Sequence, residues 1–239
     1  MRIKVHFTIL TSIATLAISH ADPESYPKPS PQPEQKAFEK AVSSEWKQVF
    51  SDDCTGDWKT NWFLDGKVGT VTTGKEGMTL TGGPEFKNDA HHMVLWTKHS
   101  FKGNIRIDYD YTRLDQENRC VNILYIQASG SGKAPYSKDI SKWTHLREVP
   151  AMKTYFDKMN SYHISYAAYG NHGKDETSYI RGRRYVPHQK GIKGTELKPD
   201  YRVKNFFKTG VKHHITVIKQ ERSLFMRVSN DEHVEYYHM

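Results

Sequence analysis

The sequence predicts an all-β fold, either a β-sandwich or a jelly roll, and three observations lead to this prediction. Beyond residue 50 the chain consists of short runs in which β-branched or aromatic residues alternate with polar ones. Gly, Asn, Asp and Lys separate these runs, as turn residues do between strands. Long stretches with the 3.6-residue period of a helix are missing. Regularly spaced short strands with turn signals are typical of two packed sheets.

The N-terminus predicts export. Arg2 and Lys4 form a short basic lead, followed by the apolar run "FTILTSIATLAIS" and the small residues around Ala21. Such a sequence is typical of a secretory signal peptide, here residues 1–21. The apolar run is shorter than the roughly 20 residues that a spanning helix needs, although an uncleaved anchor is the alternative. We therefore expect a secreted or periplasmic protein with no stable membrane association after cleavage.

Residues 22–45 are expected to form an N-terminal extension, and residues 46–239 the folded domain. The extension begins with "DPESYPKPSPQPEQ", which is rich in proline and almost free of apolar residues, as extended linkers are. The following "KAFEKAVSSEW" is compatible with one or two helical turns that pack on the edge of the domain.

Nine segments within the domain are predicted strands. A short helix is expected in "EVPAMKTYFDKMNS". The strands, in order, are "GTVTTG", "GMTLTGG", "HHMVLWTKH", "NIRIDYDYTRL", "CVNILYIQAS", "YHISYAAYG", "HHITVIKQE", "SLFMRVSND" and "HVEYYH".

Alternation along these strands separates two faces. In residues 105–111 the odd positions are Ile or Tyr, whereas the even positions carry Arg106, Asp108 and Asp110. In residues 122–128 the even positions look like core, which leaves Tyr125 and Gln127 on the other face. Aromatic and hydrogen-bonding residues on a polar face are more typical of a ligand-binding concavity than of a solvated sheet.

The charge of the chain favours an acidic partner. The sequence has 35 basic and 27 acidic residues, for a formal net charge of +8. A basic excess can indicate nucleic acid as the partner. Because the chain carries an export signal, we expect an acidic polysaccharide and no nucleic acid. A merely soluble basic surface is the alternative.

The sequence indicates no metal or redox centre. Cys54 and Cys120 could form a disulfide in an oxidising compartment, but the sequence does not show whether they approach each other. Neighbours such as His91 and His92 point to opposite faces of a strand, so they cannot both bind one ion without a bulge. We expect no cofactor. A structural calcium ion that uses the acidic residues between 52 and 57 is the alternative.

Several blocks resemble a known family in their order and spacing. They include "SDDCTGDWKTNWFLDGKVGTV", "AHHMVLWTKHSFKGNIRIDYDYTRLD", "DISKWTHLREVPAMKTYFDKMNSYHISYAAYG" and "YIRGRRYVP". Roughly residues 50 to 239 resemble the YesU-like, concanavalin-A-like β-sandwich domains, a domain of unknown function associated with rhamnogalacturonan and polysaccharide utilisation. The resemblance implies a jelly roll with a concave ligand-facing sheet, and no agreed catalytic mechanism. Two departures are Cys54, where an aromatic residue is usual, and the C-terminus, which is short for the family. Either the closing strand is missing or the edge of the sheet is finished differently.

The residue types suit β-elimination of a uronate. This reaction needs a base for the proton next to the carboxylate, and cations or amides that hold the carboxylate as charge builds. In "YHISYAAYG" the residues His163, Ser165, Ala167 and Tyr169 alternate and should share one face of a strand. We expect His163, Tyr169 and Arg106 to be catalytic. Further residues are expected to bind the substrate: Tyr125, Gln127, Trp96, His92, Asp108, Asp110, Trp143, Arg147, Ser165, Arg181 and Arg183.

Two alternatives stay open. Hydrolysis could use Asp108 and Asp110 as an acid–base pair, although Arg106 and Arg113 favour ion pairs with them and the E-x-D-x-x-E motif of related glucanases is missing. A non-catalytic carbohydrate-binding module is the other. Each predicted site residue also has a structural alternative. His163 and the tyrosines could be structural, and Trp96 and Trp143 could be core residues. The arginines of 181–184 could lie on a solvated loop.

Overall fold

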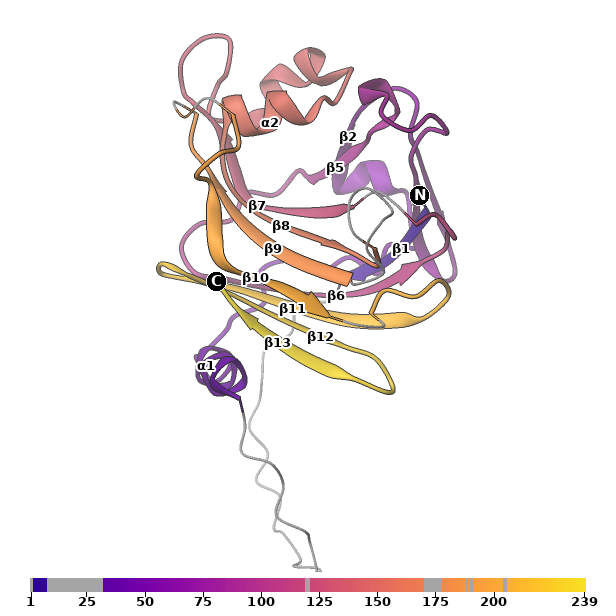
Figure 1. The fold of residues 1–239 in the computed structure, drawn as a ribbon. Coiled ribbons are helices and arrows are strands. Elements are labelled where there is room, and N and C mark those ends of the chain that lie inside the picture. Colours follow the sequence, from indigo (N-terminus) through magenta and orange to yellow (C-terminus); the bar gives the residue numbers. More distant parts are fainter. Residues whose placement is uncertain are drawn as a thin grey trace, which may run out of the picture.

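The computed structural model describes residues 2–7, 32–118, 121–169, 178–187, 189, 191–203 and 206–239. The protein is mostly β, with two antiparallel sheets packed face to face and helices on the two outer sides (Figure 1). The all-β sandwich that the sequence predicts is therefore confirmed. The finer jelly-roll description is taken up below as a proposal.

The larger sheet has seven strands in the order β13-β12-β11-β6-β1-β4-β3. Neighbouring strands are all antiparallel. In the order of the sheet, their bounds are Val234–His238, Ser223–Ser229, Lys212–Gln220, Ile105–Arg113, Arg2–Phe7, Gly77–Thr81 and Thr70–Gly74.

The smaller sheet has four strands in the order β10-β9-β8-β7, and a separate pair joins β2 to β5. The four strands are Glu196–Val203, Ser178–Tyr185, Met159–Ala167 and Asn122–Gly130. The pair consists of Trp62–Asp65 and Val94–Thr97. The ring of Trp96 on β5 stacks on Tyr125 of β7 at 5.3 Å, so the pair lies beside the free edge of the smaller sheet.

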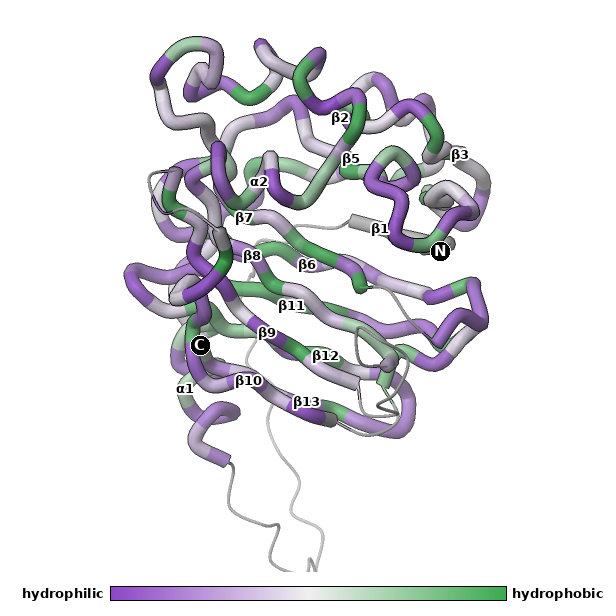
Figure 2. The backbone as a smooth tube through the Cα atoms, turned by 45° about the horizontal axis from the view of Figure 1, so that its top comes forward, coloured by the Kyte–Doolittle hydropathy of each residue, from purple (hydrophilic) through white to green (hydrophobic). Residues whose placement is uncertain are grey.

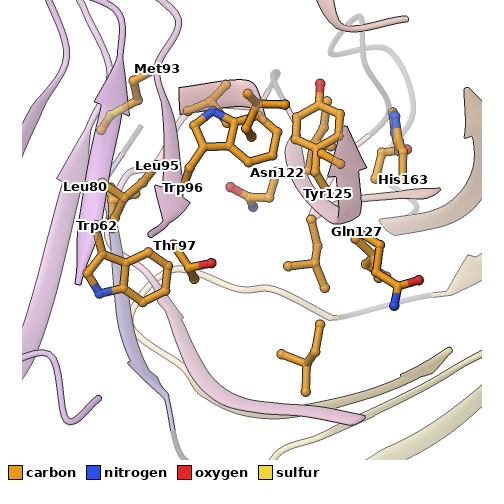
Figure 3. Close-up of a pocket in the computed structure, with 18 of the residues that line it drawn as sticks. Trp62, Leu80, Met93, Leu95, Trp96, Thr97, Asn122, Tyr125, Gln127 and His163 are labelled. Atoms are coloured by element: carbon orange, nitrogen blue, oxygen red, sulfur yellow. The ribbon is translucent and has the colours of Figure 1, made fainter. Parts of the chain in front are cut away.

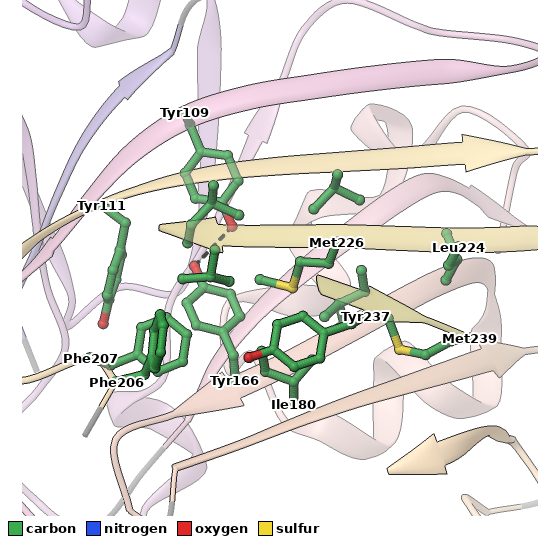
Figure 4. Packing of buried hydrophobic residues seen from close by; sticks show 14 of the residues in the cluster. Tyr109, Tyr111, Tyr166, Ile180, Phe206, Phe207, Leu224, Met226, Tyr237 and Met239 are labelled. Atoms are coloured by element: carbon green, nitrogen blue, oxygen red, sulfur yellow. Dashed lines mark hydrogen bonds between the residues drawn. The ribbon is translucent and has the colours of Figure 1, made fainter. Parts of the chain in front are cut away.

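The main core fills the space between the two sheets (Figure 4). β6 contributes Tyr109 and Tyr111, both of which are buried, as the alternation in its sequence predicts. The hydroxyl of Tyr109 bonds to that of Tyr166 on β8 at 3.2 Å, and Asn122 donates to the hydroxyl of Tyr111 at 2.7 Å. These bonds satisfy polar groups that would otherwise be costly to bury. Figure 2 shows the matching pattern, with hydrophobic stretches along the inner strands and hydrophilic loops at the rim.

Helices cover the outer sides of both sheets. Helix α1 (Pro33–Val42) lays Phe38 and Ala41 on Ile218 and Phe225, on the outer face of the larger sheet. On the opposite side of the molecule, α2 and the 3-10 segment η3 lie above β7, β2 and β5 (Figure 1). Their bounds are Met152–Lys158 and Ile140–Arg147, and two further 3-10 turns are η1 (Trp58–Thr60) and η2 (Asp89–His91).

All nine predicted strands are present, and four others were missed. The segment around Arg181–Arg184 was expected to be a loop or hairpin, but it is the strand β9, paired on both sides. Gly182 interrupts its pattern because an added Cβ there would lie 2.7 Å from the sulfur of Met239. Pro199 interrupts the strand pattern of β10 in a similar way. That strand lies at the edge of the sheet, where proline is tolerated. The other two missed strands are β1 and β2.

Strand β1 lies inside the predicted signal peptide. It pairs with β6 on one side and with β4 on the other, so that Val5 faces Tyr111 and Met78. Removal of residues 1–21 would leave the four-stranded part β13-β12-β11-β6 and the hairpin β3–β4. Among the described residues, no helix is both long enough and apolar enough to cross a membrane.

Candidate functional site

A cavity of about 2390 Å³ lies between the β2–β5 pair and the smaller sheet. Trp62, Leu80 and Leu95 form one wall, and Tyr125 and His163 lie on the opposite wall (Figure 3). The first wall is apolar, whereas the second carries most of the polar residues that the sequence singles out. Chemistry in this cavity must therefore come from the face of the smaller sheet.

Strand pairing places the polar residues of that face in rows. Tyr125 on β7 faces His163 on β8, and His163 in turn faces Arg183 on β9. One step along the strands, Ser165 faces Arg181. Because alternate residues point to the same side of a strand, both rows project into the cavity and away from the main core. The predicted alternation of residues 162–167 accounts for this arrangement.

His163 is the most unusual residue of the cavity. Its side chain is buried, at 3% exposure. Its Nδ1 lies 2.5 Å from the hydroxyl of Tyr185, whereas its Nε2 has no hydrogen-bond partner among the described residues. The rings of Tyr125 and Tyr185 meet the imidazole edge-on at 5.7 Å and 5.1 Å. One nitrogen is thus held in place, and the other is buried without a partner among the described residues.

The surroundings keep His163 uncharged at neutral pH. Burial, together with the positive charges of Arg183 and Arg181, lowers the pKa of His163 to about 3. A neutral imidazole can act as a base or as a hydrogen-bond donor. A carboxylate bound next to it would offset the arginine charges and raise the pKa of His163 again.

Two arginines supply positive charge to this wall. Arg183 donates from Nη1 to Glu196 at 2.9 Å and to Thr195 at 2.8 Å. Arg181 donates from Nε to Asp200 at 2.9 Å. Within the described part of the chain, each guanidinium makes these bonds through one nitrogen only, so its other N–H groups can hold a ligand carboxylate. Glu196 and Asp200, both on β10, are the resident counterions.

The predicted sugar-stacking residues Trp96 and Tyr125 line the cavity, but their faces are covered. Tyr125 is sandwiched between Trp96 at 5.3 Å and Tyr155 at 5.4 Å, with interplanar angles of 25° and 28°. The Tyr125 hydroxyl also contacts the sulfur of Met152 at 3.5 Å. These rings give the wall rigidity and offer no open platform to a sugar.

Trp143 and Arg147 belong to a buried cluster above the sheet. Both side chains are fully buried, and Arg147 stacks over the Trp143 ring at 4.2 Å. Arg147 donates to Asp65 at 2.5 Å, and Asp65 also accepts from Trp96 at 2.7 Å and from Tyr155 at 3.2 Å. The structure thus gives Trp143 and Arg147 contacts that fasten η3 and α2 to β2 and β5, and neither residue lines the cavity.

The structure separates three other predicted residues from His163. Asp108 and Asp110 point to the outer face of the larger sheet, where Asp108 bonds to Arg106 and Thr216. Burial tends to raise the pKa of Asp110, but Lys212 and His214 lower it overall. Tyr169 follows the end of β8 at Ala167, and its ring lies near Arg113 at 5.4 Å. The strand alternation that was used to align Tyr169 with His163 does not extend that far.

Three more predicted residues lie at the margin of the cavity. Arg106 lines it, but its guanidinium is engaged by Asp108 at 2.9 Å. Gln127 has a positive φ of 54° at a bulge in β7, and its amide donates to the carbonyl of Gly103 at 2.8 Å. His92 lies 3.6 Å from Asp89. Arg106 shares the outer face of the larger sheet with Asp108, and none of the three bonds to His163 among the described residues.

The sequence offered Tyr185 only as part of an expected loop or hairpin, so its bond to His163 was missed, as were the two β10 carboxylates. The sequence does contain a pattern that predicts the position of Tyr185. In "YIRGRRY", the residues Tyr179, Arg181, Arg183 and Tyr185 alternate as one face of a strand does. The pairing with Glu196 and Asp200 depends on the register of β9 and β10, which includes an irregularity between Leu197 and Tyr201. No local pattern predicts that register.

The described residues contain no group of three or more His, Cys, Asp or Glu that could hold a metal ion. Asp52, named for a calcium site, accepts from Asn61 at 2.9 Å and from Trp62 at 2.7 Å. Asp53 and Asp57 accept backbone N–H groups two residues along the chain, as turn residues do. Cys120, the second half of the disulfide that the sequence permits, lies outside the described residues.

Comparison with known proteins adds no assignment: no family model, no curated protein and no solved structure matches this chain.

Proposed function

We propose that the protein is an exported, carbohydrate-active protein of concanavalin-like jelly-roll type that acts on an acidic polysaccharide by β-elimination. The fold type, the YesU-like resemblance and export rest on the sequence blocks and on the N-terminal segment described above. The cavity enclosed between the β2–β5 pair and the smaller sheet supports a ligand-facing concavity.

One observation supports this function more than any other. His163 is neutral and fixed at Nδ1 by Tyr185, and its unpaired Nε2 lies on a wall that also carries Arg181 and Arg183. A buried polar atom without a partner is rare in folded proteins. Removal of a proton from the carbon next to a carboxylate requires a base, and cations beside that base stabilise the charge that develops.

The residues then divide the work as follows. Arg183 and Arg181 hold the uronate carboxylate and stabilise the negative charge that spreads into it during proton removal. His163 accepts the proton from the adjacent carbon at Nε2. The covered stack of Trp96, Tyr125 and Tyr155 keeps the imidazole in place.

A panel of uronate-rich polysaccharides tests this function. Elimination leaves an unsaturated uronate, so absorbance in the near ultraviolet should rise with the wild-type protein and not with His163→Gln. His145→Gln is the matched control, because His145 lies exposed on η3 and should leave the rate unchanged. New reducing ends without that absorbance, or full activity of His163→Gln, would contradict the proposal.

A non-catalytic binding module is the second candidate, and the deep burial of His163 favours it. In that case, the same polysaccharides would bind without any new absorbance or reducing ends. Hydrolysis by Asp108 and Asp110 has no comparable support, since both carboxylates lie on the outer sheet face and are engaged by Arg106, Thr216, Lys212 and His214.

A further inference from the structure

We infer that Tyr185 is the acid that protonates the leaving oxygen in this elimination, and that it does so through its hydrogen bond with His163. The inference rests on the proposed function and extends it, because elimination needs an acid as well as a base when the leaving group is a sugar oxygen.

The position of Tyr185 suits that role. It lies at the end of β9, next to Ser161 of β8, and lines the cavity. The edge contacts with His163 at 5.1 Å and with Phe156 at 6.2 Å hold its ring. In the part of the chain that the structure describes, the only bond of its hydroxyl is the 2.5 Å contact with Nδ1 of His163. Base and acid are thus directly connected.

The number of unsatisfied buried groups indicates which atoms of His163 and Tyr185 carry protons in the protein without substrate. If Nδ1 carried the hydrogen, both the Tyr185 hydroxyl proton and Nε2 would lack a partner. If Tyr185 donates to Nδ1, only the N–H at Nε2 remains unpaired. The second arrangement leaves fewer buried groups unsatisfied, so His163 rests with its proton on Nε2. Burial also raises the pKa of Tyr185, which keeps the hydroxyl protonated as a donor.

A bound substrate changes this arrangement. When the glycosidic oxygen accepts the Tyr185 hydroxyl, Nδ1 loses its donor, and the imidazole proton moves to Nδ1 by exchange with water in the cavity. Nε2 is then bare and can act as the base. The substrate thereby creates the reactive form of His163.

The elimination step then balances within the pair. The C–H bond next to the carboxylate breaks and its proton goes to Nε2, while the electron pair forms the carbon–carbon double bond. The bond from the next carbon to the glycosidic oxygen breaks, and that oxygen takes the hydroxyl proton of Tyr185. The Tyr185 oxygen takes the proton from Nδ1 in turn. The pair therefore returns to the proton arrangement of the free protein, ready for the next substrate.

Of the other tyrosines that line the cavity, Tyr109 and Tyr166 bond to each other between the two sheets. The remaining two are placed less well than Tyr185. The hydroxyl of Tyr125 contacts Met152, and Tyr179 bonds to Ser165 and faces Ala167, two rows from His163. Within the described residues, neither hydroxyl bonds to the imidazole, so neither can take a proton from it directly. Tyr185 is therefore the one we assign.

Substrates with different leaving groups test the assignment. The probes are methyl glucuronosides and galacturonosides that carry at C4 either a sugar or a 4-nitrophenoxy group, which leaves without a proton. Tyr185→Phe should slow release of the sugar by about 100-fold or more, the usual contribution of a general acid. It should slow release of nitrophenolate by less than about 5-fold, since no acid is needed. His163→Gln should abolish both reactions.

Tyr162→Phe is the matched control, because Tyr162 lies on the opposite face of β8 against the core. Equal losses on both substrates in Tyr185→Phe, or no loss on either, would overturn the assignment of Tyr185 but leave the proposed function in place. No elimination of any probe by the wild type would instead overturn the proposed function, and the assignment with it.

Nitrogen NMR of ¹⁵N-histidine-labelled protein tests the proton arrangement without any substrate. His163 should show its hydrogen on Nε2 in the wild type, and a shifted tautomer balance in Tyr185→Phe. An unchanged tautomer in the variant would show that Tyr185 does not control the proton at Nδ1, which would exclude the relay.

Discussion

His163 combines features that a purely structural histidine does not need. Its Nδ1 is bonded to Tyr185, its Nε2 is unpaired, and two arginines disfavour its charged form. The sequence predicted the face on which His163 lies, because strand alternation depends only on local geometry. The identity of its partner could not be predicted in the same way, because it depends on how β8 and β9 align.

The low pKa of His163 predicts a pH-dependent stability. Its pKa is about 3 in the folded protein against 6.5 for the unperturbed group. Between these values the unfolded chain binds a proton that the folded protein does not, so stability falls as the pH drops from 6.5 towards 3. The loss is at most about 1.4 kcal/mol per pH unit. His163→Gln removes this pH-dependent contribution to the free energy of unfolding.

Urea unfolding at several pH values between 7 and 4 measures the effect. The free energy of unfolding of the wild type should fall more steeply with acid than that of His163→Gln, whereas the exposed control His145→Gln should follow the wild type. Parallel profiles for the wild type and His163→Gln would show that the imidazole is already accessible to protons.

At the scale of elements, the segment η3 is fastened to the sheets by one buried ion pair. Arg147 and Asp65 are both fully enclosed, and Trp96 and Tyr155 add two further donors to the same carboxylate. Burial raises the pKa of Asp65, and its bonds with Arg147, Trp96 and Tyr155 oppose that rise. The sequence predicted that Trp143 and Arg147 bind substrate, and did not predict that Arg147 would bond to an aspartate 82 positions away.

Removing one partner of this pair should be costly. Asp65→Asn leaves Arg147 buried without a counter-charge, which costs about 3–5 kcal/mol in comparable buried pairs. Arg147→Met leaves Asp65 in the same condition. The double variant should lose clearly less than the sum of the two single losses, because no unpaired charge remains. Urea unfolding of all three variants gives these values, and strictly additive losses would contradict the direct pairing.

At the scale of the whole molecule, the β-sandwich follows from the alternation of apolar and polar residues and from the turn residues between the strands. Nine strands were predicted from alternation and turns, and each is present. β9 and β10 were missed because glycine or proline interrupts their pattern. The alternation predicted a ligand-binding concavity, but its second wall could not be predicted, because that wall depends on how the β2–β5 pair packs against the smaller sheet. Short strands such as β2 gain their place from tertiary packing.

The N-terminal segment has two descriptions that make different predictions for the whole chain. We expect the exported protein to begin at Asp22, since residues 1–21 have the features of a signal peptide. Mass spectrometry of the protein from the culture medium or periplasm measures this directly. A chain that retains Met1 would instead indicate that Arg2–Phe7 stays in the larger sheet between β6 and β4.

The central claim is that the cavity wall formed by β8 and β9 receives an acidic sugar. A crystal structure of His163→Gln soaked with a uronate oligosaccharide tests it most directly. We predict that a sugar carboxylate lies within hydrogen-bond distance of Arg181 or Arg183, with its neighbouring carbon facing residue 163. Sugar bound only on the outer face of the larger sheet, near Asp108 and Asp110, would contradict the claim.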